Sequence, residues 1–281
     1  MSASGRRAVW TLGVLLLAAW LVPLLASQDP LQIGDVVAAR LVPPLAHDAS
    51  GHWHLLGTDR FGRDLLARMM LAGRLSLAIG FGGSLLASTL GVLIGAGAAW
   101  WGGLFDRFAM AFSDALLAMP RLILLLLVAA LWRPGAGAVV WVLALTGWMG
   151  VARLVRGEVL GVRQLLYVDA ANALGVKGWR LVWRHVLPNA LGPAIVATTL
   201  GVGNAILLES GLAFLGLGVQ PPHPSWGNMI AGGRDLIVTA PWVAVAPGLA
   251  LIVTVLATTV LGDDLRDALA GERVAVLADR T

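Results

Sequence analysis

The stretch Asp169–Asn189, DAANALGVKGWRLVWRHVLPN, decides how this chain folds and what it contacts. It is polar, basic and rich in small residues, and it lies between two long apolar runs. Asp169 can accept backbone N–H bonds at the start of a short helix, and Gly175 can supply the left-handed residue that ends it. A second helix, about 178–187, would follow and end at Pro188. The stretch predicts a helical hairpin that either meets a soluble partner or lies on a membrane face without one.

The composition around this stretch is that of a membrane protein. The chain has 281 residues, of which 58% are hydrophobic and 13% charged, whereas an ordinary soluble domain has about 25% charged residues. Several nearly uncharged runs are about 20 residues long, which is the length of helix that crosses the hydrocarbon layer. The chain contains no cysteine, so disulfides and cysteine-ligated metals are excluded.

Six spans are predicted, with a short turn at about 100–113 and an amphipathic helix just before the second span. An even number of spans places both termini on one side, and the arginines near the central stretch and the tail make that side cytoplasmic. Residues 28–74, which carry five arginines, argue against this orientation. The first run resembles a signal peptide but is interpreted as an uncleaved span. The predicted spans are about 8–26, 75–99, 113–132, 136–151, 191–214 and 243–261.

The central stretch resembles a known motif. The pattern D-A-A-x-x-x-G, followed by Leu187-Pro188, is similar to the EAA loop of ABC importer permeases. In that family the loop forms a coupling helix that docks in a groove on the cytoplasmic ATPase subunit. Asp169 stands where the family usually has glutamate, so the charge is kept but the reach is shorter. The resemblance implies a coupling role, within a loop of about 164–189, for Asp169, Ala170, Ala171, Leu174, Gly175, Leu187 and Pro188.

Three further stretches resemble the peptide and nickel branch of that family, in its second-permease type. They are HLLGTDRFGRDLLAR at 54–68, ESGLAFLGLGVQPPHPSWGNMI at 209–230 and PGLALIVTVLATTVLGDDLRDAL at 247–269. The resemblance implies an all-α membrane protein with six transmembrane helices and the type I ABC importer transmembrane fold. Its parts would be an N-terminal helix with an extracytoplasmic segment (1–74), a core transmembrane domain (75–262) and a cytoplasmic tail (263–281).

The same resemblance implies the partners and the activity. The partners would be a second homologous permease, two cytoplasmic ATP-binding subunits and an extracytoplasmic solute-binding protein, in the bacterial plasma (inner) membrane. The chain has no G-x-x-x-x-G-K-[ST] phosphate loop, so ATP hydrolysis would belong to the partners, and no enzyme activity or cofactor is expected here. The basic balance reflects membrane orientation rather than nucleic-acid binding.

Di- and oligopeptides are the expected substrates, and nickel is the alternative. A non-transporting membrane scaffold or receptor is the alternative class. An intramembrane serine protease built on Ser210 would lack a histidine base, because no predicted span contains a histidine.

Two charged residues within apolar runs are candidate pathway residues. An ionised side chain at mid-bilayer costs about 2.5–3.5 kcal/mol, so Glu209 should face protein or water. It would line the pathway or form a structural hydrogen bond to the irregular backbone that follows. Arg121 would line the pathway or extend its side chain to the cytoplasmic interface.

The loop before the second span offers weaker candidates. Asp59 should bond local backbone in a turn shaped by Gly57 and Gly62, rather than hold a metal or phosphate. His52 and His54 are interpreted as solvated loop residues, with a metal site as the alternative if the substrate is nickel.

Overall fold

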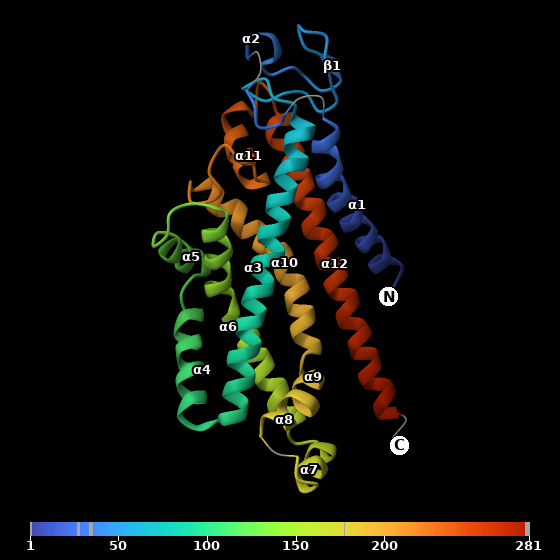
Figure 1. Cartoon of the computed structure of the whole chain (residues 1–281), viewed down its shortest axis with the longest axis vertical. Helices are drawn as coiled ribbons and strands as arrows, with labels where there is room; N and C mark the ends of the chain where they lie inside the picture. Colours follow the sequence, from blue (N-terminus) through green and yellow to red (C-terminus); the bar gives the residue numbers. More distant parts are fainter. Residues whose placement is uncertain (1, 27–28, 34–35, 177, 279–281) are drawn as a thin grey trace.

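The computed structural model describes the backbone of residues 2–26, 29–33, 36–176 and 178–278, and side-chain surroundings as far as residue 270. Long helices dominate an elongated bundle (Figure 1). Five of them are long and apolar enough to cross a membrane, and the bent pair α4 (Gly103–Leu117) and α5 (Arg121–Ala129) provides a sixth if it counts as one span. The five are α1 (Ala3–Leu25), α3 (Leu65–Trp101), α6 (Ala136–Val162), α10 (Gly192–Phe214) and α12 (Trp242–Ala278).

The centre of the bundle is the contact between α3 and α6, which small residues bring close together. A Cβ added at Gly95 would meet the carbonyl of Ala152, and one added at Gly91 would meet Val151. Close approach of helix backbones at glycine is the usual way that helices pack in a bilayer, where water does not drive them together. Gly91 and Gly95 therefore allow α3 and α6 to pack closely.

Helix α1 packs on its own bundle, against α3 and α12. Pro23 lies inside α1 and has no N–H, so the carbonyl of Ala19 loses its partner within the helix. Arg74 of α3 replaces that partner: its Nε donates to the Ala19 carbonyl at 2.7 Å and its Nη2 to the Trp20 carbonyl at 2.8 Å. Arg74 of α3 thus supplies the hydrogen bond to the Ala19 carbonyl that Pro23 removes from α1.

Three differences between the predicted spans and the helices lie in α3, α4 and α5. The amphipathic helix and the second span form the single helix α3, which begins directly after its cap Asp64, whose side chain accepts from the Ala67 N–H at 2.9 Å. The predicted turn at 100–113 is mostly the helix α4, because Gly102 and Gly103, with φ of 62° and 60°, complete the reversal. The third span is broken and bent by 99°, since Pro120 cannot continue a helix.

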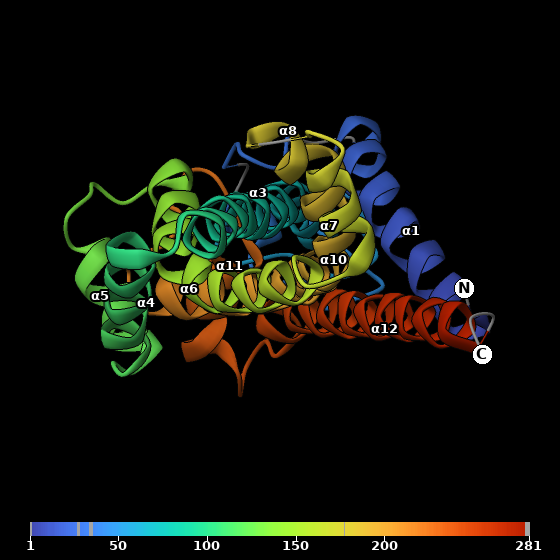
Figure 2. The same ribbon diagram turned by 90° about the horizontal axis from the view of Figure 1, so that it is seen from below.

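Short elements cover the two ends of the bundle. At one end lie α2 (Val36–Ala39), the antiparallel pair of β1 (Ala46–His47) and β2 (Trp53–His54), α11 (Trp226–Gly233) and the 3₁₀ helix Arg234–Leu236. At the other end lie α7 (Leu166–Ala173), α8 (Trp179–Leu181), the π-helix Val182–Val186 and α9 (Leu187–Ala190). Figure 2 shows this second end from below, with α7 and α8 beside the ends of α3 and α6.

Candidate functional site

The hairpin formed by α7 and α8 is the outermost part of one end of the molecule (Figure 1). Helix α6 runs on to Val162 instead of ending near Val151, so the predicted polar loop from 152 begins inside it. Helix α7 starts after Leu165, and Asp169 lies in its first turn rather than at its N-cap as predicted. The carboxylate there still complements the positive end of the helix dipole.

Gly175 ends α7 as predicted. Its φ is +88°, and the Gly175 N–H donates to the Asn172 carbonyl while the Val176 N–H donates to that of Ala171. These two bonds and the left-handed residue form a Schellman motif, which satisfies the last carbonyls of a helix. The turn directs Val176 back into the cluster of apolar residues beneath the hairpin. Gly175 therefore fixes the shape of the hairpin.

The predicted coupling residues separate into a buried group and an exposed group. Ala171 and Leu187 lie in an apolar cluster with residues of α3 and α6, where Leu187 is 5% exposed. The exposed group, in contrast, can meet another molecule, and Leu174 in it is 86% exposed. Leu166, which is 85% exposed, lies on the same helix and was missed by the sequence interpretation. The exposed group comprises Asp169, Ala170, Leu174, Gly175 and Pro188.

The second half of the hairpin differs from the single predicted helix. It consists of α8, the π-helix and α9, and Pro188 lies inside α9 instead of ending the segment. The wider π turn accommodates the proline: the Leu187 N–H donates to the carbonyl of Val182 five residues back. The side chain of Asn189 donates to the His185 carbonyl at 2.8 Å. The chain turns into α10 only at Leu191.

The two candidate pathway residues do not meet. Glu209 is 0% exposed in α10 and faces the side chain of Ser225, but neither of its carboxylate oxygens makes a hydrogen bond of standard geometry among the described residues. The predicted hydrogen bond to nearby backbone is therefore absent from that part of the chain. Arg121 begins α5 and its Nη2 lies 3.5 Å from where a Cβ on Gly147 would be. Gly147 is near the middle of α6, so the guanidinium of Arg121 lies beside that helix, and its extension to the cytoplasmic interface stays a prediction.

Ser210 offers no protease site in the described residues. Its hydroxyl is buried without a hydrogen-bond partner there, so no base is positioned to activate it.

The loop before α3 is more ordered than the sequence indicated. Asp59 accepts the N–H groups of Phe61 and Arg63, as predicted, and Gly57 and Gly62 have φ of +78° and +72°. His54 is not solvated: it is 2% exposed, with Nδ1 2.8 Å from Asp64 and Nε2 3.4 Å from Asp48. The described residues contain no group of three or more His, Cys, Asp or Glu side chains that could hold a metal ion.

Comparisons with known proteins agree with this architecture. Residues 87–271 match the family model described as the binding-protein-dependent transport system inner membrane component. The glutathione transport system permease protein GsiD of Pectobacterium atrosepticum is 40% identical over 221 residues, covering 79% of this chain and 73% of its own. The dipeptide transport system permease protein DppC of Alkalihalophilus pseudofirmus is 37% identical over 258 residues, covering 90% and 81%.

A solved structure shares the fold. The inward-facing MetNI methionine ABC transporter matches with a TM-score of 0.59 at 19% identity, over 73% of this chain and 96% of that one. The helices, the family match and these relatives confirm the predicted ABC permease fold. The chain therefore belongs to the family of inner membrane components of binding-protein-dependent transport systems.

Proposed function

We propose that this permease subunit carries di- and oligopeptides, and that the exposed face of α7 is its docking site for an ATPase subunit. The observation that carries the docking role is the exposed face itself. It combines Asp169, Ala170 and Leu174 at the outermost point of a helix pair whose other face is packed on α3 and α6. Substrate class is supported by the relatives, which are named for dipeptide and glutathione transport.

The proposed complex contains a second permease, two cytoplasmic ATP-binding subunits and a solute-binding protein. Closure of the ATPase subunits would move the two coupling hairpins, and each bundle would tilt as a rigid body so that the pathway opens alternately to each side. Ala171 and Leu187 transmit this motion because they anchor the hairpin to the bundle. ATP hydrolysis belongs to the partners in this proposal.

The proposed organisation places both termini and the hairpin in the cytoplasm. Residues 1–74 form the N-terminal span and the extracytoplasmic segment, residues 75–262 the core transmembrane domain, and residues 263–281 the cytoplasmic tail. Glu209 and Arg121 are proposed pathway residues. Glu209 lies inside the long helix α10, and Arg121 lies at the break between α4 and α5. A charged side chain within an apolar span is costly unless it serves transport or a buried contact.

The test replaces Gly175 with valine in the assembled complex. A β-branched residue at a φ of +88° is strained by roughly 1–2 kcal/mol, so the hairpin must change shape. Peptide uptake is expected to fall about tenfold, which corresponds to 1.4 kcal/mol, while ATP hydrolysis by the complex continues. Uptake of a radiolabelled tripeptide and phosphate release are measured in parallel, and ⁶³Ni²⁺ replaces the peptide in a second series.

Two variants make the result specific. Gly175→Asn should keep most of the uptake, because asparagine tolerates the left-handed conformation. Gly161→Val lies on α6, where no atom would obstruct the new side chain, and should behave as wild type. Normal coupling in Gly175→Val would refute the docking role. Transport of nickel but not peptide would refute the proposed substrate alone.

A further inference from the structure

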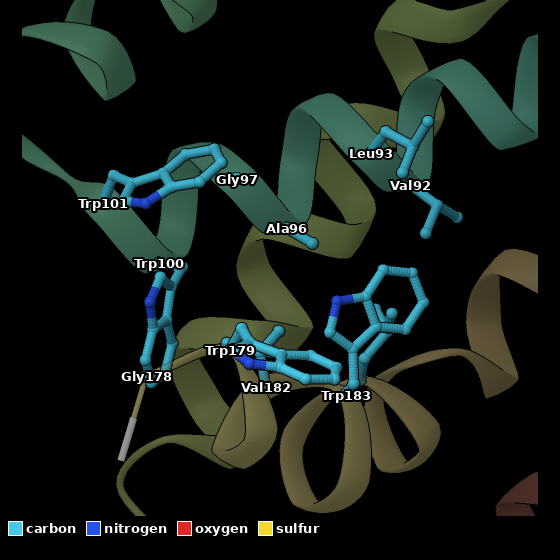
Figure 3. A pocket seen from close by; sticks show the side chains of 11 residues that line it. Val92, Leu93, Ala96, Gly97, Trp100, Trp101, Gly178, Trp179, Val182 and Trp183 are labelled. Carbon is cyan, nitrogen blue, oxygen red and sulfur yellow. The ribbon is translucent and has the colours of Figure 1, made fainter.

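A pocket separates the end of α3 from the second half of the hairpin (Figure 3). Its volume is about 320 Å³, within the range of roughly 300–1,000 Å³ for small-molecule sites. One wall is α3, with Val92, Leu93 and Ala96; the facing wall is α8 and the π-helix, with Trp179 and Trp183. Every residue that lines it is apolar or glycine.

The helix and the side chains that form the pocket favour contact with lipid rather than with water. Helix α3 is a candidate membrane span, and Leu93 on its wall of the pocket is 54% exposed, as expected for a side chain that contacts hydrocarbon. Four indole rings line the pocket: Trp100 and Trp101 from α3, and Trp179 and Trp183 from the hairpin. Trp101 and Trp179 are 73% and 72% exposed. Tryptophan gathers at the level of the lipid headgroups, where its ring is apolar and its N–H is polar.

One arginine contacts a tryptophan of this apolar pocket, and two more are next to pocket tryptophans in the sequence. The guanidinium of Arg163 lies 4.9 Å from the ring centroid of Trp100, and its Nη1 donates to the Ala99 carbonyl. Arg180 and Arg184 each follow a pocket tryptophan by one residue, and both are exposed. No ion pair holds either of them within the described part of the chain. Basic groups beside an apolar slot at the cytoplasmic level favour an anionic lipid headgroup.

We propose that the pocket binds one acyl chain of an anionic phospholipid, whose headgroup lies on Arg180 and Arg184. The assignment rests on the proposed function only in placing the hairpin at the cytoplasmic leaflet. A protein segment in the pocket would need hydrogen-bond acceptors as well as donors for its backbone, and the only polar side-chain groups on the walls are the indole N–H donors. A hydrocarbon chain has no such requirement, and it would join α3 to the part of the hairpin that contains the π-helix.

The experiment uses the full chain, alone and in its assembled complex, in nanodiscs of phosphatidylcholine. A trace of phosphatidylglycerol carries a diazirine near the end of one acyl chain, and the crosslinked residues are mapped by mass spectrometry after illumination. The expected labels are on Leu93, Val182 and Trp183, and unlabelled phosphatidylglycerol should compete for them. A phosphatidylcholine probe with the same diazirine should label these positions several-fold less.

Matched variants separate the pocket from the headgroup site. Leu93→Trp, at a 54% exposed position, should fill the pocket and abolish the label, whereas Leu249→Trp, 57% exposed on α12, should not. Arg180→Gln and Arg184→Gln should each weaken phosphatidylglycerol labelling about fivefold, the contribution of one basic residue near an anionic surface. Arg107→Gln, exposed on α4, is the charge control. All these positions are exposed, so the variants should fold.

Three results would overturn the proposal. They are label spread evenly over the spans, equal labelling by the two lipids, and labelling of the isolated chain that disappears in the complex. The third result would assign the pocket to a protein subunit. The readout needs neither transport nor ATP hydrolysis, so its failure would leave the docking role of α7 untouched.

Discussion

Glu209 places a carboxylate at a fully buried position of α10, where it faces Ser225 without a hydrogen bond of standard geometry to any described residue. A buried polar group without a partner costs about 1–3 kcal/mol, and more when it is charged. Glu209→Leu is therefore expected to stabilise the chain by about 1–3 kcal/mol, seen as a higher thermal unfolding temperature in detergent. Peptide uptake should fall if the carboxylate serves the pathway.

The comparison variant is Glu209→Gln, which keeps the shape and removes the charge. Stabilisation by leucine together with full uptake in both variants would show that Glu209 takes no part in transport. A loss of stability in Glu209→Leu would mean that the carboxylate makes a stabilising hydrogen bond in the folded protein, and Ser225 is the side chain that would make it.

Asp48 makes the segment before α3 sensitive to acid. Burial raises the pKa of this carboxyl, but the backbone N–H groups of His52 and Ser50 and the ring of His54 together lower the pKa below 3.8. A carboxylate with a lowered pKa stabilises the folded state above its unfolded pKa, and that contribution is lost as the pH falls through the folded value. Hydrogen exchange of residues 41–64, corrected for intrinsic rates, should therefore accelerate below pH 3.8.

Asp48→Asn should exchange faster than wild type already at neutral pH and change less on acidification. Asp235→Asn, on an exposed side chain, should follow the wild-type profile. Identical profiles for Asp48→Asn and wild type would contradict the role of these hydrogen bonds.

Features of single residues were predictable where their causes are local. Gly175 and Asp59 act through backbone within four residues of them, so their roles follow from the sequence. His54 does not, because its carboxylate partners depend on how the loop folds back onto the start of α3. Leu166 was missed because the apolar run at 165–168 does not show which of its side chains the fold leaves exposed.

At the scale of elements, Pro23 and Arg74 couple two helices. Arg74→Met would leave the carbonyls of Ala19 and Trp20 without their donors, at a cost of about 1–3 kcal/mol. Pro23→Ala supplies an N–H within α1 that can reach Ala19. The double variant should therefore lose less stability than Arg74→Met alone, as measured by thermal unfolding. Strictly additive effects would show that the arginine does not compensate the proline.

Hydropathy identified the long helices but not their limits. The apolar runs fix where α3, α6 and α10 cross, because length and composition suffice for that inference. Their ends depend on other causes: the cap at Asp64, the reversal at Gly102 and the break at Pro120. The extension of α6 to Val162 also escaped prediction, since its polar last turns pack on the hairpin only after folding.

At the scale of the whole molecule, the orientation can be tested because the chain has no cysteine. Single cysteines can replace Val37, which is 96% exposed at one end, and Leu174, which is 86% exposed at the other. The two cysteines should be equally reactive in detergent. In intact spheroplasts, a membrane-impermeant maleimide should label Val37→Cys alone, and in permeabilised cells it should label both. Labelling of Leu174→Cys in intact spheroplasts would invert the proposed topology.

The unbroken course of α6 has a mechanical consequence. The helix has 27 residues and is about 40 Å long at 1.5 Å per residue, with α7 attached just beyond its end. If α6 tilts by about 5° around its N-terminal end, its C-terminal end, where α7 is attached, moves by roughly 3.5 Å. The proposed ATPase-driven movement of the hairpin by a few ångströms would therefore need only a small tilt of α6, without unwinding of any of its turns.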